Sequence, residues 1–299
     1  MKVGILSMQR IINYGSFMQS YALKRIIESM GHEVEFVDYK VEPPIVLTDK
    51  EKKEYTKYKI KNFIKDFIVS YNGIFFLLPK KSQKIFKHYK RYNEEFLPLL
   101  GVSKKRNYNP KVDVLIIGSD EVFNCLQKNP RVGYSRELFG FNNNAKKLMS
   151  YAASFGNTTL QRLNEYGVAR DVSDLLLKFD CISVRDSNSG KIVTELTGKE
   201  PKYNLDPVLI YDFSKEIPNI NIKNDYIVIY AYPGRLRAEE KSAIKNFAEK
   251  KEKRLVCLGG YQDFCDEYID ASPFELLSYV KNADYVITEA GFGVDLGAE

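Results

Sequence analysis

The sequence contains few residues of the kinds that bind metal ions or form disulfide bonds. It has two histidines, His32 and His88, neither of which follows a predicted strand, so we expect both at the surface. Its four cysteines are scattered without a CxxC pair, at Cys125, Cys181, Cys257 and Cys265. This pattern excludes a Cys/His zinc site, and we expect neither a metal nor a cofactor.

Long apolar runs and a leader segment are also missing. No stretch reaches the roughly 18 uncharged apolar residues that would indicate a transmembrane helix. Residues 1–6 predict a strand and lack the hydrophobic region of a signal peptide. The net charge of +6 over 299 residues is too small to indicate a nucleic-acid-binding protein. We therefore expect a globular cytoplasmic protein with no nucleic-acid partner.

The charge is concentrated in one segment. Residues 49–95 contain 13 Lys and Arg against six Asp and Glu, and the rest of the chain is almost neutral. Apolar residues recur there at helical spacing, which predicts a basic helical insertion. Such helices can rest on an anionic membrane surface, here at the inner face of the membrane, or on an acidic glycan. The alternative is a solvated lysine face on an ordinary helix.

Short apolar runs alternate with amphipathic stretches along the chain, which is typical of an α/β fold with parallel sheets. Proline and asparagine residues around 211–225 predict a boundary between two domains. We expect residues 1–215 and 220–299 to form two wound Rossmann-like domains facing a cleft, the second of them incomplete. The predicted strands are 2–8, 33–39, 112–117, 148–154, 181–184, 226–230, 255–258 and 285–288, with helices at 16–30, 160–179, 238–251 and 273–281.

Polar residues follow several of these strands, at the sheet edge where such folds bind ligands. Asn13, Gly15 and Ser16 lie between the first strand and its helix, where backbone amides favour an anion. The alternative is a tight turn with a helix N-cap.

The apolar strand 112–117 is followed by a second polar group. Gly118, Ser119, Asp120 and Asn124 could form a hydrogen-bonding rim for a hydroxylated ligand or a phosphate, with Asp120 as a general base. Ser119 or Asp120 could equally serve as an N-cap, a role that does not exclude function.

A third group follows strand 181–184. Ser183 lies in the strand, and Arg185 comes directly after it, where a guanidinium can bind a carboxylate or a phosphate through two hydrogen bonds. The alternative is a surface ion pair between Arg185 and Asp186.

Taken together, seven segments resemble the polysaccharide pyruvyl transferase family in order and spacing. They run over residues 1 to about 288, and each is a short motif. The segments are 4–6 with 13–16, 19–23, 31–39, 117–124, 150–156, 182–186 and 205–207.

The resemblance implies a transferase that moves the enolpyruvyl group of phosphoenolpyruvate to a sugar hydroxyl and leaves a pyruvate ketal on a cell-surface glycan or its precursor. It also implies a fold like the GT-B glycosyltransferases, with Arg185 binding the donor and Asn13, Gly15, Ser119 and Asp120 lining the facing loops. The implied partners are phosphoenolpyruvate and a glycan or lipid-linked sugar.

The sequence departs from the family near its end. Family members carry a histidine in the loop after the strand at 285–288, where this chain has Phe292. Loss of a positioned general acid typically slows a reaction by about 10²–10⁴-fold, which predicts an impaired enzyme. The alternatives are a non-catalytic anion- or glycan-binding protein and a GT-B-type glycosyltransferase.

Overall fold

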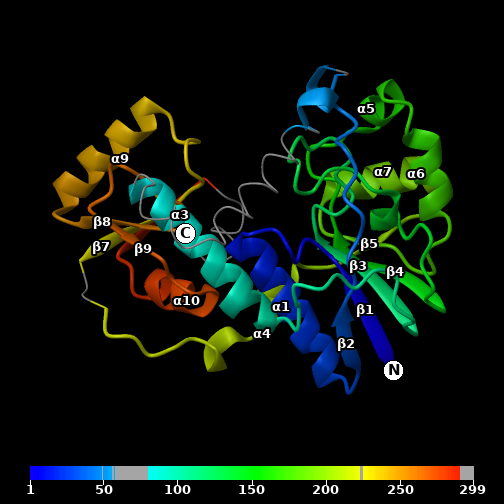
Figure 1. Cartoon of the computed structure of the whole chain (residues 1–299), viewed down its shortest axis with the longest axis horizontal. Helices are drawn as coiled ribbons and strands as arrows, with labels where there is room; N and C mark the ends of the chain where they lie inside the picture. Colours follow the sequence, from blue (N-terminus) through cyan, green and yellow to red (C-terminus); the bar gives the residue numbers. More distant parts are fainter. Residues whose placement is uncertain (49, 56, 58–79, 223–224, 290–299) are drawn as a thin grey trace.

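The computed structural model describes residues 1–48, 50–55, 57, 80–222 and 225–289. Within these ranges the chain forms two parallel sheets, each with helices packed beside it (Figure 1). Both sheets are wound as in Rossmann-like domains, so the predicted α/β fold class is confirmed. Phe292 and the loop that would contain the family's histidine lie outside the described residues.

The first sheet has six parallel strands in the order β2-β1-β3-β4-β5-β6. Its central strand β3 is the apolar run predicted to be buried, and its residues pair with β1 and β4. The strands are β1 (Lys2–Leu6), β2 (Glu33–Phe36), β3 (Val114–Asp120), β4 (Lys147–Ala153), β5 (Ser183–Val184) and β6 (Lys202–Tyr203). The helices of this half are α1 (Tyr14–Ser29), α5 (Leu160–Glu165), α6 (Ala169–Leu176), α7 (Ser187–Thr197) and α8 (Pro207–Ile210).

The second sheet has four parallel strands in the order β10-β7-β8-β9. Its central strand β7 is buried along its whole length. The strands are β7 (Tyr226–Tyr230), β8 (Arg254–Leu258), β9 (Glu267–Ile269) and β10 (Tyr285–Thr288), and the helices are α9 (Ala238–Lys251) and α10 (Pro273–Lys281).

Helix α1 lies between the two sheets (Figure 1). Its buried residues Phe17 and Met18 belong to one hydrophobic core that includes Ile5 of β1 and Val228 of β7. Because this core is shared, removal of apolar surface from water stabilises the contact between the two halves as well as each half. The N-terminus of α1 contacts both halves, because Ser16 donates a hydrogen bond to Asp120 at the end of β3 and Asn13 donates one to Tyr232 after β7.

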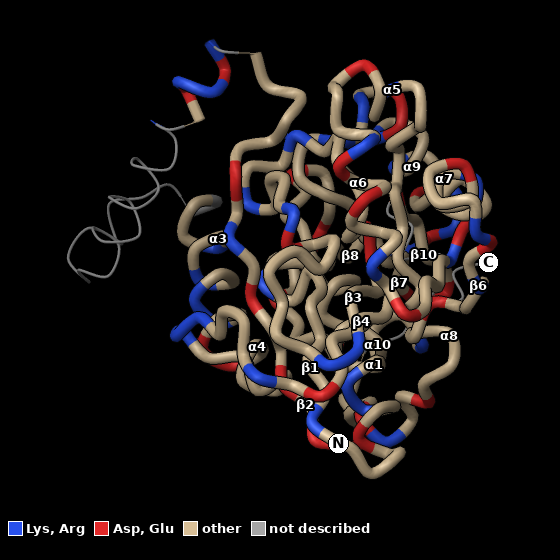
Figure 2. Tube along the Cα trace, turned by 90° about the vertical axis from the view of Figure 1, so that its right-hand side faces the viewer, with Lys and Arg blue, Asp and Glu red and all other residues tan. Residues whose placement is uncertain are grey.

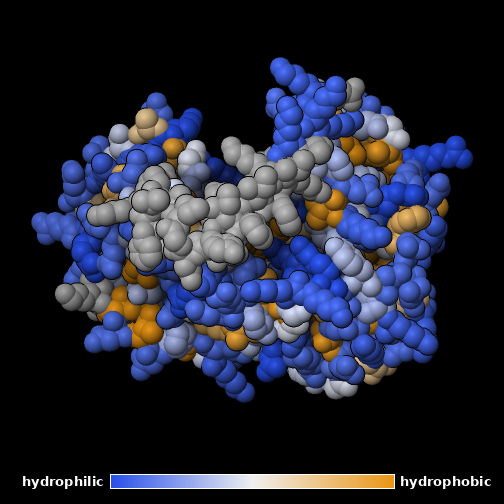
Figure 3. Space-filling model, in the orientation of Figure 1, coloured by the Kyte–Doolittle hydropathy of each residue, from blue (hydrophilic) through white to orange (hydrophobic). Residues whose placement is uncertain are grey.

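The basic segment contributes helix α3 (Lys80–Arg91) and most of a π-helical turn (Tyr92–Phe96), and the short helix α4 (Leu97–Leu99) follows it. Helix α3 packs on the second sheet, because its side chains contact the β9–α10 connection. Its Lys84, Lys87 and Lys90 are part of a series of basic residues along the helix (Figure 2). Figure 3 shows a mostly hydrophilic face with small separate hydrophobic groups.

Several predicted elements have different limits in the structure. The helix expected at 160–179 is divided into α5 and α6, because Gly167 adopts a left-handed φ of +68° between them. Strands β6 and β9 were not predicted, since they are only two and three residues long and show no clear alternation. The expected strands 33–39 and 181–184 are shorter than predicted, ending at Phe36 and beginning at Ser183.

Candidate functional site

The carboxyl edge of the first sheet brings together three of the predicted site residues, Ser16, Asp120 and Arg185. Ser16, in the first turn of α1, donates a hydrogen bond from Oγ to Asp120 Oδ2 at 2.7 Å. Arg185 Nη2 lies 4.0 Å from Asp120 Oδ1. The side chains of Arg185 and Asp120 are 24% and 18% exposed, so both remain accessible to a small ligand. The site is therefore a partly buried arrangement of one guanidinium, one carboxylate and one hydroxyl.

The principal ion-pair partner of Arg185 is Asp206, which we did not include among the site residues. Arg185 Nη1 lies 2.5 Å from Asp206 Oδ2, and that carboxylate also accepts from Gln19 Nε2 at 2.5 Å. The alternative interpretation, a surface ion pair with Asp186, is wrong, because Asp186 caps α7 through the Ser189 amide at 2.8 Å. Asp206 therefore holds the Arg185 guanidinium in position.

Electrostatics keep Arg185 charged. Burial lowers the pKa of its guanidinium, but the nearby carboxylates of Asp120 and Asp206 outweigh that effect and raise the pKa overall. A charged guanidinium with one edge toward Asp206 and another toward Asp120 can donate several hydrogen bonds to an anion.

The backbone around Asp120 has an unusual shape that positions this side chain. Asp120 has a φ of +80°, a region that non-glycine residues seldom occupy. Gly118 has a φ of +124°, and a Cβ atom there would lie 2.2 Å from the carbonyl oxygen of Tyr151. Glycine is therefore required at 118 because β3 and β4 approach each other closely at this point.

Ser183, Asn124 and Ser119 are buried beneath this edge. Ser183 Oγ donates to Asn204 Oδ1 at 2.6 Å and accepts from the Ala152 amide at 3.0 Å. Asn124 Oδ1 accepts from the Leu126 amide at 3.0 Å, and Ser119 is 1% exposed. We interpret these residues as supports of the loops that carry Asp120 and Arg185.

Asn13 caps helix α1, which was the alternative interpretation of its motif. Its Oδ1 accepts from the amides of Gly15 and Ser16 at 2.5 and 3.3 Å. Its Nδ2 donates to the hydroxyl of Tyr232, in the loop after β7. This short motif therefore joins the N-terminus of α1 to the second half of the molecule.

A cavity of about 290 Å³ lies beside Asn13, between the two halves. Loops after β7 and β8 line it from one side, and α3 and the start of α1 line it from the other. Six of its residues are tyrosines, and no Lys, Arg, Asp or Glu is among the described residues that line it. The tyrosines are Tyr14, Tyr89, Tyr230, Tyr232, Tyr261 and Tyr268.

His88 also lines this cavity, which corrects the expectation that it lies at the surface. The residue is only 8% exposed, and its Nδ1 lies 2.6 Å from Asp270 Oδ1. Sequence reasoning missed it because His88 follows no strand and comes from the basic segment. Its contacts with the second half depend on how α3 crosses the molecule, and the local sequence does not specify that crossing.

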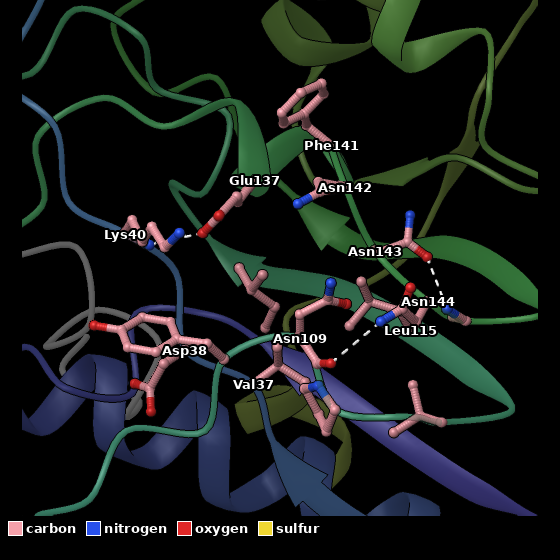
Figure 4. Close-up of a pocket in the computed structure, with 15 residues that line it drawn as sticks. Val37, Asp38, Lys40, Asn109, Leu115, Glu137, Phe141, Asn142, Asn143 and Asn144 are labelled. Atoms are coloured by element: carbon pink, nitrogen blue, oxygen red, sulfur yellow. Dashed lines mark hydrogen bonds between the residues drawn. The ribbon is translucent and has the colours of Figure 1, made fainter.

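A second cavity, of about 160 Å³, lies at the other side of the first sheet (Figure 4). Its walls include Asn109, Asn142 and Glu137, and Glu137 accepts from the Lys40 amide at 2.7 Å. Asp38 at its rim is already bound by the guanidinium of Arg10, with Nη2 at 2.7 Å. None of the predicted site residues lines this cavity.

Two features of the described part of the chain bear on ligands and membranes. No group of three or more His, Cys, Asp or Glu side chains there is placed to hold a metal ion. Within the same ranges, every helix is too short or too polar to cross a membrane.

Comparison with known proteins identifies the family. The sequence profile described as "Polysaccharide pyruvyl transferase" matches residues 13–290, nearly the whole chain. The chain therefore belongs to the polysaccharide pyruvyl transferase family, a family of transferases, as its motifs indicated.

More distant comparisons add little to this result. A search of curated proteins finds no match. Among solved structures, the chain is similar to one titled "Crystal Structure Analysis of the Glycotransferase of kitacinnamycin", with 13% sequence identity and a TM-score of 0.42. That match covers 99% of this chain and 77% of the other.

Proposed function

We propose that this protein binds phosphoenolpyruvate at Arg185 and transfers its enolpyruvyl group to a sugar hydroxyl of a cell-surface glycan or its precursor. The observation that carries the proposal is the position of Arg185. Its guanidinium is partly exposed at the carboxyl edge of the first sheet, next to Asp120 and the first turn of α1. A carboxylate and a phosphate on one small molecule suit a guanidinium beside a helix N-terminus.

The charges around Arg185 give Asp120 a role in this proposal. Arg185 carries one positive charge, whereas Asp120 and Asp206 are two carboxylates within 4.0 and 2.5 Å of it. Asp206 is nearly buried and engaged by Arg185 and Gln19, whereas the side chain of Asp120 is 18% exposed beside Arg185. We therefore assign Asp120 as the general acid–base group next to the donor.

The proposed reaction balances without an oxidant or a reductant. Two sugar hydroxyl oxygens form bonds to C2 of phosphoenolpyruvate, and the bond between C2 and the phosphate oxygen breaks. One hydroxyl proton ends on C3, which becomes a methyl group, and the other leaves with inorganic phosphate. The products are a pyruvate ketal and phosphate, so release of phosphate measures transfer.

Calorimetric titration with phosphoenolpyruvate tests the donor site. We expect wild type to bind and Arg185→Gln to lose at least about 100-fold in affinity, as expected for removal of a charge-assisted hydrogen-bonding group. Arg254→Gln is the matched control, because Arg254 forms an ion pair with Glu267 at 3.2 Å on the second sheet. Equal affinity of wild type and a folded Arg185→Gln protein would remove Arg185 from the donor site.

A second measurement separates an enzyme from a non-catalytic binding protein. Phosphate release and ketal formation are followed with a panel of methyl glycosides as acceptors. Binding of phosphoenolpyruvate without transfer would favour the non-catalytic alternative, which the presence of Phe292 at the family's histidine position supports. In that case we expect Phe292→His to raise transfer.

Contact with an anionic membrane surface through residues 49–95 is a further part of this proposal. The described part of that segment includes the series of lysines on α3 (Figure 2). Binding to vesicles that contain an anionic lipid, compared with neutral vesicles, tests it.

A further inference from the structure

The cavity beside Asn13 differs chemically from the Arg185 site. Its described lining includes six tyrosines and His88, and it contains no Lys, Arg, Asp or Glu. Burial raises the pKa of Tyr14, Tyr230 and Tyr232, so their hydroxyls stay neutral. A trianion would lose its hydration in such a cavity, because the nearby cations Lys84 and Arg235 lie over the rings of Tyr261 and Tyr232 and are not part of the lining. The cavity therefore suits a different, uncharged ligand.

A sugar ring fits this lining. The C–H faces of a pyranose pack against aromatic rings, and its hydroxyls hydrogen-bond with tyrosine hydroxyls and backbone groups. Tyr261 and Tyr268 form an edge-to-face pair with centroids 5.8 Å apart, and Tyr14 and Tyr230 lie 6.4 Å apart. The volume of about 290 Å³ is enough for one sugar ring.

His88 supplies the imidazole among the described residues of this lining, and its ring is held in one orientation. Its Nδ1 lies 2.6 Å from Asp270 Oδ1, and its ring packs edge to face against Tyr14 and Tyr92, with centroids 5.7 and 6.0 Å away. A carboxylate that accepts the Nδ1 proton leaves Nε2 as the basic nitrogen. This is the arrangement in which a carboxylate positions a histidine as a general base.

The cavity and the donor site lie on two sides of the same helix N-terminus. Asn13 lines the cavity and caps α1, and three residues later Ser16 donates its hydrogen bond to Asp120. The two sites therefore share the first turn of α1, and Tyr232 of the cavity lining lies near enough to Asp120 for that carboxylate to contribute to the raised pKa of its hydroxyl. This proximity would let a sugar hydroxyl in the cavity reach a donor at Arg185.

We propose that this cavity binds the acceptor sugar and that His88, positioned by Asp270, takes the proton of the attacking hydroxyl. The first hydroxyl oxygen bonds to C2 of the donor as the C2=C3 π bond breaks, and its proton is transferred to C3. The second hydroxyl oxygen then bonds to C2 as the bond between C2 and the phosphate oxygen breaks. Its proton moves to His88 Nε2, and His88 passes it to the departing phosphate. This inference rests on the proposed function, and its test is arranged so that the two can fail separately.

Kinetics with phosphoenolpyruvate and an active methyl glycoside test the catalytic residue. We expect His88→Gln to lower kcat by about 10²–10⁴-fold while the affinity for phosphoenolpyruvate stays unchanged. His32→Gln is the matched control, since His32 is the other histidine of the chain and lies in the turn before β2. A change in kcat below about threefold in a folded His88→Gln protein would overturn the assignment.

Asp270 is tested as a positioning residue. Asp270→Asn is expected to lower kcat by about 10–100-fold with little change in the glycoside KM, and Asp270→Glu to recover part of that loss. A merely structural role would lower stability and raise KM without a separate effect on kcat. Equal losses in Asn and Glu variants would therefore contradict the positioning role.

A binding measurement tests the cavity even if no transfer is found. With 15N-labelled histidine the protein gives signals from two imidazoles only, which the His32→Gln variant assigns. A panel of methyl glycosides of glucose, galactose, mannose and N-acetylglucosamine is titrated in the presence of phosphoenolpyruvate. Shifts of the His88 signals alone support the cavity as a sugar site, whether or not the proposed transfer occurs. Absence of any shift across the panel would overturn it.

Discussion

The two sides of the N-terminus of α1 differ in how they are built. On one side, the charged groups surround Arg185, whose guanidinium lies 2.5 Å from the carboxylate of Asp206 and 4.0 Å from that of Asp120. On the other, tyrosine rings and His88, which is paired with Asp270, line a cavity whose described lining contains no Lys, Arg, Asp or Glu. The first side suits a small anion, whereas the second suits a ring with hydroxyls.

This difference suggests that the two sites bind different ligands. In the proposed function, a charged donor and a neutral acceptor bind next to each other without exchanging sites. Charge provides that selection, since an anion gains at the guanidinium and loses in the tyrosine-lined cavity. The helix between them contributes Asn13 to one site and Ser16 to the other, and thereby fixes their spacing.

The largest effect is expected from breaking the charged side at its most buried group. Asp206→Ala leaves Arg185 and Gln19 without their carboxylate, and we expect a loss of about 3–5 kcal/mol in the free energy of unfolding. The double variant Arg185→Gln, Asp206→Asn removes both charges together, and we expect its loss in the free energy of unfolding to be clearly smaller than that of Asp206→Ala. Urea denaturation followed by circular dichroism measures both. Equal losses would show that Asp206 acts through packing and not through the ion pair.

The tyrosine-lined side is expected to respond to alkaline pH instead. Burial, and then Asp270, raises the pKa of Tyr14 well above its usual value of 10.0, and burial does the same for Tyr230. Because the folded-state pKa exceeds the unfolded one, their stabilisation is complete below about pH 10 and is lost as pH rises further. In this range each of these tyrosines lowers the free energy of unfolding by about 1.4 kcal/mol per pH unit.

Denaturation at a series of pH values above 10.0, the usual pKa of a tyrosine, measures this slope. The Tyr14→Phe variant has one fewer titrating group, so its stability should fall less steeply with pH than that of wild type. Identical slopes would mean that Tyr14 ionises without unfolding, in conflict with its burial at 2% exposure.

Much of the first side could be predicted from the sequence because its parts follow strands. The buried run that forms β3 and the loops after it mark the sheet edge, and parallel strands bring their carboxyl ends together. Arg185, Asp120 and Ser16 were therefore predicted to be neighbours, and the structure brings them together. The ion-pair partner of Arg185 could not be predicted, because Asp186 and Asp206 are equally plausible partners until the positions of the loops are known.

The second side could not be predicted because it depends on contacts between distant segments. His88 and Asp270 are 182 residues apart, and Asn13 and Tyr232 are 219 apart. A helix with a basic sequence gives no signal for where it packs. Spacing in the sequence therefore locates sites made by one sheet edge, and it misses a site made by a helix that crosses to the other sheet.

A smaller effect is expected from the hydrogen bond that joins the two sides. Tyr232→Phe removes the hydroxyl that accepts from Asn13 Nδ2, and we expect a loss of about 1 kcal/mol in unfolding free energy. Tyr108→Phe is the control. Because Tyr108 is 47% exposed, this change should leave the free energy of unfolding almost unchanged. A loss at Tyr232 no larger than at Tyr108 would mean that this bond does not couple the halves.

The smallest expected effect is also the most direct test of the contrast between the two sites. Added salt screens exposed and partly exposed charges, so raising it should weaken phosphoenolpyruvate binding by about threefold or more. Binding of a neutral methyl glycoside should not weaken, because the cavity's described lining offers it no charge to screen. Calorimetric titrations of each ligand at low and high sodium chloride make the comparison on one protein sample. If both affinities fell together, the donor and the acceptor would share the charged site, and the cavity would have to be assigned another occupant.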